Sequence, residues 1–364
     1  MKTVNNNMIK YSAIIPTYNT KEEYFIACLE SCKMQDYKNV EFIIIDDASP
    51  NPEIKKIANN FVEQDKRFRY LNLETNIGVA GARNVGVGMA NGDWIVFIDA
   101  DDYIASDYFS SIDQSLNYNL DLLIMGYYED CGKKKKIAID NVMEFNHSDM
   151  ENFQFAILTG KSINASIDFA NINVCSPWAR VYRKEVLKKT VPPIGIKKEQ
   201  DGVLSFELYE FINKCKVISY AGYFYRINQV STCRKYTENI EEILENTMLA
   251  YKERIDKYKG TNENFIFAYN IKWINIIGDI CLMKYLHNNN KESWKKRKKF
   301  FKNYISSINI RERIDYVIEN KEKYGRIMNK NLKIKIWLLK HRLVLLYFYA
   351  FEVFKKVKNP LHFS

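Results

Sequence analysis

A regular alternation of short apolar runs and amphipathic stretches over the first 130 residues most constrains the fold. This rhythm is typical of βαβ units, which form parallel sheets with helices on both faces. We expect strands at Ser12–Ile15, Val40–Asp46, Phe68–Leu73, Trp94–Asp99 and Leu120–Met125, and helices at Lys21–Met34, Glu53–Gln64, Val79–Ala90 and Ser106–Asn117. The pattern predicts an α/β fold with a mainly parallel, doubly wound sheet flanked by helices.

The pattern changes further along the chain, and 364 residues suffice for two domains. Residues 131–235 predict mixed elements: a solvated hairpin or loop at Lys133–Lys136, elements at Trp178–Leu187 and Glu199–Ile212, and short strands at Val217–Tyr220 and Tyr223–Ile227. From Glu238 the pattern is helical. We therefore expect an α/β domain over residues 1–237 and a helical, basic C-terminal region over residues 238–364.

Charge is distributed unevenly along the chain. Residues 241–364 hold 26 basic and 13 acidic residues, whereas the first 240 residues hold 28 and 31. Such asymmetry indicates an anionic partner for the C-terminal region, either an anionic membrane surface or a nucleic acid. No nucleic-acid recognition motif accompanies the lysines, so we do not expect nucleic acid binding.

The end of the chain carries an apolar segment flanked by basic residues. We expect a helix over Asn331–Lys358, in which the uninterrupted apolar stretch Leu343–Phe351 is nine residues, too short to cross a bilayer. One interpretation is an interfacial helix on anionic lipid; the other is a buried helix of the C-terminal region.

The N-terminus has no apolar signal core, and the seven cysteines include no zinc-like CxxC pair, so we expect a cytoplasmic protein with reduced thiols.

Polar residues follow three of the expected strands. They are Pro16-Thr17-Tyr18-Asn19, Asp46-Asp47-Ala48-Ser49 and Asp99-Ala100-Asp101-Asp102. In doubly wound sheets ligands bind beyond the carboxyl ends of the strands, so these tips are expected to converge on one site. The Asp-x-Asp spacing suits Mg²⁺ or Mn²⁺ held jointly with a diphosphate, and the alternative is an Asp-rich helix start.

At this point the sequence resembles the family 2 inverting glycosyltransferases of the Rossmann-like GT-A fold, of the bacterial capsule and lipopolysaccharide type. The segments that carry the resemblance, in matching order and spacing, are IIPTYN (Ile14–Asn19), FIIIDDAS (Phe42–Ser49), the run Asn76–Asp102 and KEQDGVLSFEL (Lys198–Leu208). The resemblance covers about residues 10–230 and implies transfer of a sugar from a UDP-sugar to a hydroxyl.

The resemblance also implies roles for individual residues in binding the donor. Tyr18 would stack on uracil, in a pocket shaped by Pro16 and Thr17 beside Asn19, and Asp47, next to Asp46, would accept the base N3–H. The alternatives are a packed turn residue for Tyr18 and a helix cap for Asp47. Arg83 would approach the nucleotide or diphosphate; its alternative is a surface arginine.

The carboxylates would carry the chemistry. Asp99 would contact the ribose and Asp101 the metal, with Ala100 between them, and Asp102 could share either role. Asp201 would be the general base that deprotonates the acceptor hydroxyl. Glu199 departs from the family's adjacent Glu-Asp pair because Gln200 intervenes, and helix capping is the alternative for both acids.

Three further residues are candidates for the acceptor or diphosphate site. Trp178 would stack on an acceptor sugar or belong to the core, and Arg226 or Arg234 would contact the diphosphate.

A nicotinamide dehydrogenase is excluded by the missing G-x-G-x-x-G turn and a P-loop NTPase by the missing GK[ST]. We expect a metal-dependent transferase acting on a glycan or lipid-linked acceptor in surface polysaccharide or lipooligosaccharide synthesis. The alternative is a degenerate domain that only binds sugar or nucleotide.

Overall fold

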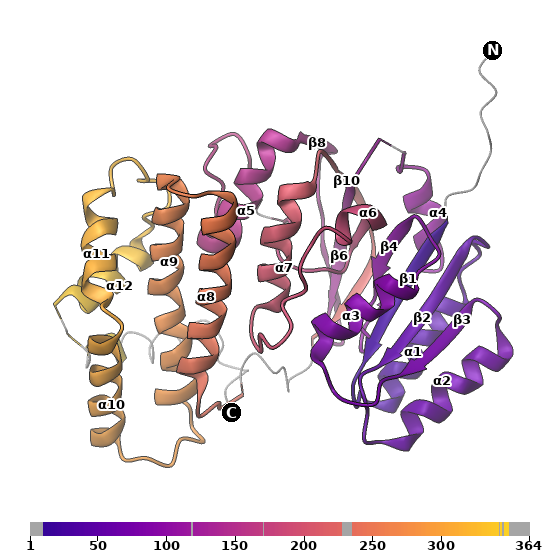
Figure 1. Ribbon diagram of the computed structural model, residues 1–364, viewed down its shortest axis with the longest axis horizontal. Coiled ribbons are helices and arrows are strands. Elements are labelled where there is room, and N and C mark those ends of the chain that lie inside the picture. Colours follow the sequence, from indigo (N-terminus) through magenta and orange to yellow (C-terminus); the bar gives the residue numbers. More distant parts are fainter. Residues whose placement is uncertain are drawn as a thin grey trace. The chain divides into compact units, whose positions relative to one another are not determined.

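The computed structural model describes residues 10–117, 119–169, 171–227, 235–341, 343 and 346–348. The chain divides into two compact units (Figure 1). The first comprises Met1–Gln154 and Phe169–Ile227, and the second comprises Phe155–Asp168 and Asn228–Ser364. Each unit is described separately below.

The first unit is an α/β domain built around one large sheet. Its strand order is β3-β2-β1-β4-β9-β6-β10-β5, and β7 and β8 pair with β6 and β10. The strands are β1 (Tyr11–Thr17), β2 (Val40–Asp46), β3 (Phe68–Asn72), β4 (Trp94–Phe97), β5 (Tyr103–Ile104), β6 (Leu122–Asp130), β7 (Lys134–Ile137), β8 (Met143–Asn146), β9 (Arg180–Arg183) and β10 (Lys214–Arg226).

Helices cover both faces of this sheet, as the alternating sequence pattern predicts (Figure 1). The helices of the unit are α1 (Glu22–Lys33), α2 (Pro52–Gln64), α3 (Gly78–Met89), α4 (Tyr108–Asp113), α5 (Met150–Thr159, which continues into the second unit), α6 (Lys184–Leu187) and α7 (Gln200–Leu208). Alternate residues of β1 explain the two layers: Ala13 and Ile15 belong to the core with α1 and α2, whereas Ile14 meets α3. The predicted α/β class is confirmed.

The sheet differs from the predicted one in its second half. Strands β3, β2, β1 and β4 are parallel, but β9 pairs antiparallel with both β4 and β6. The predicted strands Val217–Tyr220 and Tyr223–Ile227 are one strand, β10, with register shifts between Ile218 and Tyr223. The irregularity in register at Tyr220–Gly222 is local, and the pairing of β10 with β6 continues from Tyr223 onwards. The lysine run Lys133–Lys136 lies in the exposed hairpin of β6 and β7, as expected.

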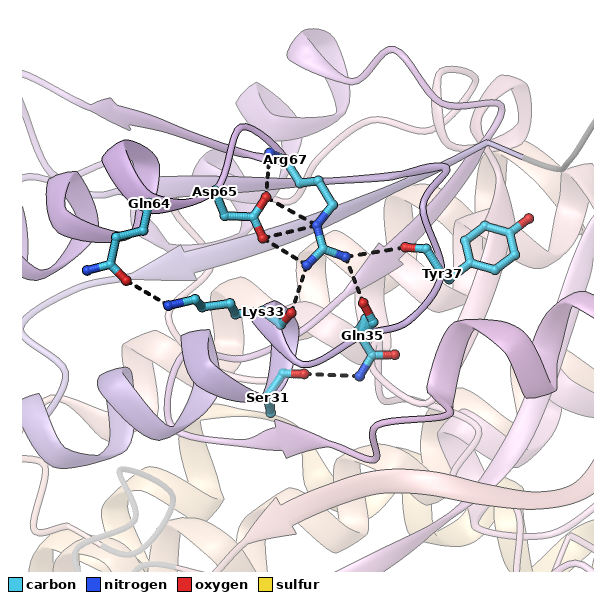
Figure 2. A network of polar contacts seen from close by, with 7 residues as sticks. All are labelled: Ser31, Lys33, Gln35, Tyr37, Gln64, Asp65 and Arg67. Atoms are coloured by element: carbon cyan, nitrogen blue, oxygen red, sulfur yellow. Dashed lines mark hydrogen bonds and ion pairs between the residues drawn. The ribbon is translucent and has the colours of Figure 1, made fainter.

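Arg67 holds together the edge of the sheet opposite the carboxyl ends of the strands (Figure 2). Its guanidinium binds the Asp65 carboxylate and donates to the backbone oxygens of Lys33, Gln35 and Tyr37 at 2.7, 2.9 and 3.3 Å. These oxygens belong to the end of α1 and the loop after it, where helix carbonyls lack intrahelical partners. Arg67 therefore fixes the loop that leads into β2.

The fit of α3 on β1 depends on one glycine, and this gives a stability prediction. A Cβ added at Gly86 would lie 2.4 Å from Cγ2 of Ile14, whereas one added at Gly88 meets nothing within 4 Å. We expect Gly86→Ala to lower the free energy of unfolding by about 1–3 kcal/mol through overpacking. Gly88→Ala, in the same helix, should raise it by up to about 1 kcal/mol. Urea denaturation followed by circular dichroism measures both; equal effects would contradict this packing.

The second unit is helical over the residues that the structure describes. Its main helices are α8 (Ile240–Tyr258), α9 (Glu263–Ile280), α10 (Trp294–Ser307), α11 (Ile310–Glu319) and α12 (Lys330–Lys340), with a π-helical turn at Cys281–Tyr285. Within the described residues, Glu263–Tyr285 alone is long and apolar enough to cross a membrane. Its most apolar window is 72% buried in the protein, which is typical of a core helix.

The predicted helix Asn331–Lys358 is confirmed as far as Lys340 but does not continue unbroken beyond it. Helix α12 ends at Lys340, and the Leu343 N–H donates to the Leu338 oxygen at 2.9 Å, a contact that closes the helix end. Most of Leu343–Phe351 lies outside the described residues. The alternative of a buried helix holds for one side of α12, where Leu332, Ile336, Leu338 and Leu339 are buried.

Candidate functional site

The loops after β1, β2 and β4 meet at the carboxyl edge of the sheet, as the sequence predicts. The Asn19 N–H donates to the Ser49 hydroxyl at 2.8 Å, and the Asp47 N–H donates to the Thr17 oxygen at 2.9 Å. The Ile98 N–H donates to the Ile14 oxygen at 3.0 Å and so places the fourth strand's tip alongside the first. These bonds follow from parallel pairing, which brings the carboxyl ends of neighbouring strands to one edge.

The first two tips contain strained turns and an exposed aromatic ring. Asn19 and Ala48 have positive φ angles of 50° and 60°, a region that alanine rarely adopts. Pro16 and Thr17 are buried in β1, while Tyr18 keeps 54% of its surface exposed. Tyr18, directly after β1, therefore offers an exposed ring for stacking, and the buried Pro16 and Thr17 support the turn that carries it.

The two aspartates after β2 bind the protein itself. Asp47 accepts from the N–H groups of Ile77 and Gly78, both at 2.8 Å, at the start of α3. The alternative of a helix cap is thus present, although on α3 rather than on α2, which Asn51 caps. Asp46 accepts from the Ser49 N–H and the Tyr70 hydroxyl, both at 2.9 Å. Recognition of a base N3–H by Asp47 stays a prediction.

Arg83 joins two carboxylates from distant parts of the sequence. It is almost completely buried, and it binds Oδ1 of Asp99 and Oδ1 of Asp201, each at 2.7 Å. Asp99 follows β4, and Asp201 lies in the first turn of α7. The alternative of a surface arginine is therefore wrong. The structure brings three predicted site residues into one ion-pair network, which we call the Arg83 triad.

Burial and charge act against each other in the Arg83 triad. Burial lowers the pKa of Arg83, but the negative charges of Asp201 and Asp99 outweigh it and raise the pKa overall. The pKa of Asp201 is raised above its ordinary value, chiefly by burial among protein atoms, although Arg83 opposes the shift. The Asp201 side chain nevertheless keeps 41% of its surface accessible to solvent. A raised pKa makes a carboxylate a better proton acceptor.

Asp102 belongs to the scaffold of the site. Its buried carboxylate accepts from the Tyr223 hydroxyl and from the backbone N–H of Arg226, both at 2.7 Å. The same hydroxyl accepts from the Asp99 N–H at 3.1 Å. Tyr223 thus fixes the whole Asp99–Asp102 turn on β10, a role that the sequence analysis missed because an apolar strand gives no signal for one particular tyrosine. Both oxygens of Asp102 have protein donors, which argues against Asp102 as a metal ligand.

The acidic turn has the donor chemistry for a divalent cation. Burial raises the pKa of Asp102, and the negative charges of Asp99 and Asp101 raise it further. A cation would relieve this repulsion, and carboxylate oxygens suit Mg²⁺ or Mn²⁺. No three His, Cys, Asp or Glu side chains are grouped tightly enough, within the described residues, to hold an ion alone. Mg²⁺ commonly takes only one or two carboxylates and completes its shell with phosphate and water, so the residues fit a shared site.

The remaining candidates divide into residues near the acidic turn and residues elsewhere. Arg226 donates to the Asp101 backbone oxygen at 2.6 Å and lies 4.5 Å from the ring centre of Tyr24, a neighbour that the sequence did not indicate. Trp178 is buried against Tyr223 and Tyr225, so the core interpretation holds for it. Glu199 precedes α7 with a positive φ of 56°. Arg234 lies outside the described residues.

Comparison with solved structures identifies the fold. The structure of residues 1–349 of TarS from S. aureus, in complex with UDP-GlcNAc, matches with a TM-score of 0.64 and 19% identity. The match covers 96% of this chain and 92% of that chain. At this identity the likeness establishes the fold alone. The α/β unit with its polar strand tips is therefore a GT-A domain, followed by a mostly helical region, as predicted.

Sequence comparison identifies the family. The sequence model named Glycosyl transferase family 2 matches residues 12–191. Glycosyltransferase GlyA of Streptococcus pneumoniae is 31% identical over 243 residues, which are 63% of this chain and 32% of that protein. EpsH of Bacillus subtilis is 27% identical over 271 residues, 71% of this chain and 74% of that protein. The chain belongs to glycosyl transferase family 2, and it spans about a third of the length of GlyA.

Proposed function

We propose that this chain is an inverting, metal-dependent glycosyltransferase that moves a sugar from a UDP-sugar to a hydroxyl of a glycan or lipid-linked acceptor. The Arg83 triad is the observation that carries the proposal, because it joins an accessible carboxylate of raised pKa to the acidic strand tip. The solved relative TarS binds UDP-GlcNAc and UDP, which supports a uridine nucleotide as the donor carrier.

The proposed mechanism assigns one task to each accessible group. Tyr18 stacks on the base, and the strand tips beside it hold the nucleotide. Asp201 accepts the proton of the acceptor hydroxyl while the oxygen attacks the anomeric carbon opposite the departing diphosphate. Arg83 orients the Asp201 carboxylate through its 2.7 Å ion pair and holds Asp99 at the same distance. Proximity of the bound reactants supplies much of the remaining rate.

A divalent cation completes the proposed site. Asp101, with Asp99 beside it, would hold Mn²⁺ or Mg²⁺ together with the donor diphosphate. When bound, the ion neutralises charge on the leaving group. Inside the protein, Tyr223 and the backbone N–H of Arg226 keep Asp102 in place, and Arg226 holds the Asp101 backbone oxygen. These contacts fix the direction in which the Asp101 side chain leaves the turn.

The proposed setting is bacterial surface glycan assembly. TarS, a relative of this chain, is named a poly(ribitol-phosphate) beta-N-acetylglucosaminyltransferase, which supports a surface polymer or a lipid-linked precursor as acceptor class. The C-terminal region, with 26 basic and 13 acidic residues over 241–364, suits the anionic surface of a membrane. We therefore propose a cytoplasmic enzyme that associates with the inner membrane surface through its basic C-terminal region.

The first experiment is a donor panel. We expect turnover or binding of one UDP-sugar, in preference to GDP- and CMP-sugars, that requires Mn²⁺ or Mg²⁺ and is lost in EDTA. Asp101→Ala should lower kcat/KM by about 100-fold or more, because a metal's charge stabilisation is worth several kcal/mol. Asp36→Ala is the matched control: this exposed aspartate precedes β2, at the opposite edge of the sheet. No metal-dependent interaction with any nucleotide sugar would favour a degenerate domain.

A further inference from the structure

One side of α12 is exposed and combines apolar with basic residues. Apart from Asn331, the exposed residues are spaced as one helical face: Lys330, Lys333, Ile334, Trp337 and Lys340, which we call the outer face of α12. Ile334 is 43% and Trp337 is 54% exposed, although both are large apolar side chains. The helix buries its other side, so the exposure of these two residues is not explained by packing within the unit.

Helix α10 shows the same combination of residues. Phe300 is exposed among exposed lysines, which are Lys295, Lys296, Lys299 and Lys302, whereas Trp294 is 37% exposed and packs against Phe348 with ring centres 5.5 Å apart. Neither the sequence of α10 nor that of α12 contains an acidic residue. Lys340 pairs with Asp315 at 3.3 Å and Lys296 with Glu292 at 3.1 Å, so the other lysines supply most of the available charge. Two separate helices of the unit thus present aromatic rings within a basic surface.

We infer that the outer face of α12 and the exposed side of α10 bind the surface of an anionic lipid bilayer. Tryptophan prefers the boundary between headgroups and acyl chains, and isoleucine gains from burial there. Lysines around them attract anionic headgroups. A soluble anionic polymer would satisfy the lysines but would leave Ile334 and Trp337 in water, so the apolar residues favour the bilayer. The inference narrows the proposed membrane association to named residues and rests on no catalytic step.

The test is flotation of the full chain with vesicles of phosphatidylcholine, with and without phosphatidylglycerol. We expect wild type to float with the anionic vesicles only. The double variant Ile334→Ser/Trp337→Ser should bind them about tenfold more weakly, since two interfacial apolar side chains are lost. Lys330→Glu/Lys333→Glu should lose binding to a similar extent, and added salt should weaken binding by wild type.

The matched control is Leu249→Ser in α8. Leu249 is 58% exposed, yet Glu245 and Glu253 lie one turn before and after it, so the variant should float like wild type. Circular dichroism checks that all variants fold, and turnover of a UDP-sugar without lipid should be equal in all of them. Retained turnover without flotation of wild type would overturn this inference alone. Equal flotation of wild type and Ile334→Ser/Trp337→Ser would overturn it too, as would binding to soluble polyphosphate but not to vesicles.

Discussion

Asp201→Asn is expected to lower kcat by about 100- to 10,000-fold, the range that a positioned general base contributes. Asparagine has nearly the same shape and keeps an oxygen that can accept from Arg83, but it cannot take up a proton at neutral pH. The Asp201 carboxylate lies 2.7 Å from Arg83 and is partly accessible, so the loss should come from chemistry rather than from folding. The KM for the donor should stay within a few-fold of wild type.

Glu199→Gln is the control that decides between the two acids of this segment. Glu199 lies two residues before Asp201, outside α7. The ion pairs described for Arg83 are with Asp99 and Asp201 and not with Glu199. We expect this variant to keep kcat within about tenfold of wild type. A large loss in Glu199→Gln together with a small loss in Asp201→Asn would reverse the assignment of the base.

The dependence of activity on pH is an independent test of Asp201 as the general base. Burial raises the pKa of Asp201, and the base works only in its deprotonated form. Activity should therefore rise with pH through a pKa that lies above the ordinary aspartate value, and it should fall as pH drops below it. This acidic limb of kcat/KM should disappear in Asp201→Asn. An unchanged acidic limb in the residual activity of the variant would assign the titration to another group.

Arg83→Met is expected to impair both stability and turnover. It removes the cation that Asp99 and Asp201 share and leaves two carboxylates facing each other across a site that already contains Asp101 and Asp102. Breaking a buried ion pair lowers the free energy of unfolding by about 3–5 kcal/mol. Because Asp201 is partly exposed, we expect a decrease at the lower end of that range. We expect kcat to fall by about 100-fold or more, because the base loses its orienting partner.

One further variant separates charge from geometry at Arg83, and another is a control at a different ion pair. Arg83→Lys keeps the charge, but an ammonium group lacks the planar fork that reaches two carboxylates, so intermediate stability and activity are expected. Arg69→Met removes a more exposed arginine that binds Glu41 at 3.0 Å, and it should cost less than about 1 kcal/mol. Thermal unfolding and steady-state kinetics measure all three. Wild-type turnover in Arg83→Met would show that the triad has no part in catalysis.

The fold could be predicted where the signal is local. Val40–Asp46 is a strand over the expected residues because an apolar run between polar turns specifies it without reference to the rest of the chain. The antiparallel strand β9 could not be predicted, since its place between β4 and β6 depends on pairing across more than 50 residues of sequence. The end of α12 at Lys340 was missed because the apolar pattern continues past it.

The site could be predicted as a set of residues but not as a network. The alternation of strands and helices alone implies that the Asp46 and Asp99 tips lie at the same edge of the sheet, because both follow strands expected to be parallel. Nothing in the sequence shows that Arg83 turns inward to Asp201, which lies 118 residues further along. The difference between Asp101 and Asp102 also required the structure, because it depends on Tyr223 of β10. The sequence shows where the motif lies in the chain, but the role of each residue within it depends on tertiary contacts of this kind.

The most direct test of the central claim is proton NMR of the first sugar released from the preferred UDP-α-sugar. Slow transfer to water needs no identified acceptor, and the anomeric signal reports the stereochemistry before mutarotation. The account predicts that the β-anomer appears first, only with Mn²⁺ or Mg²⁺, and far more slowly in Asp201→Asn. Initial appearance of the α-anomer, or equal rates in wild type and Asp201→Asn, would contradict it.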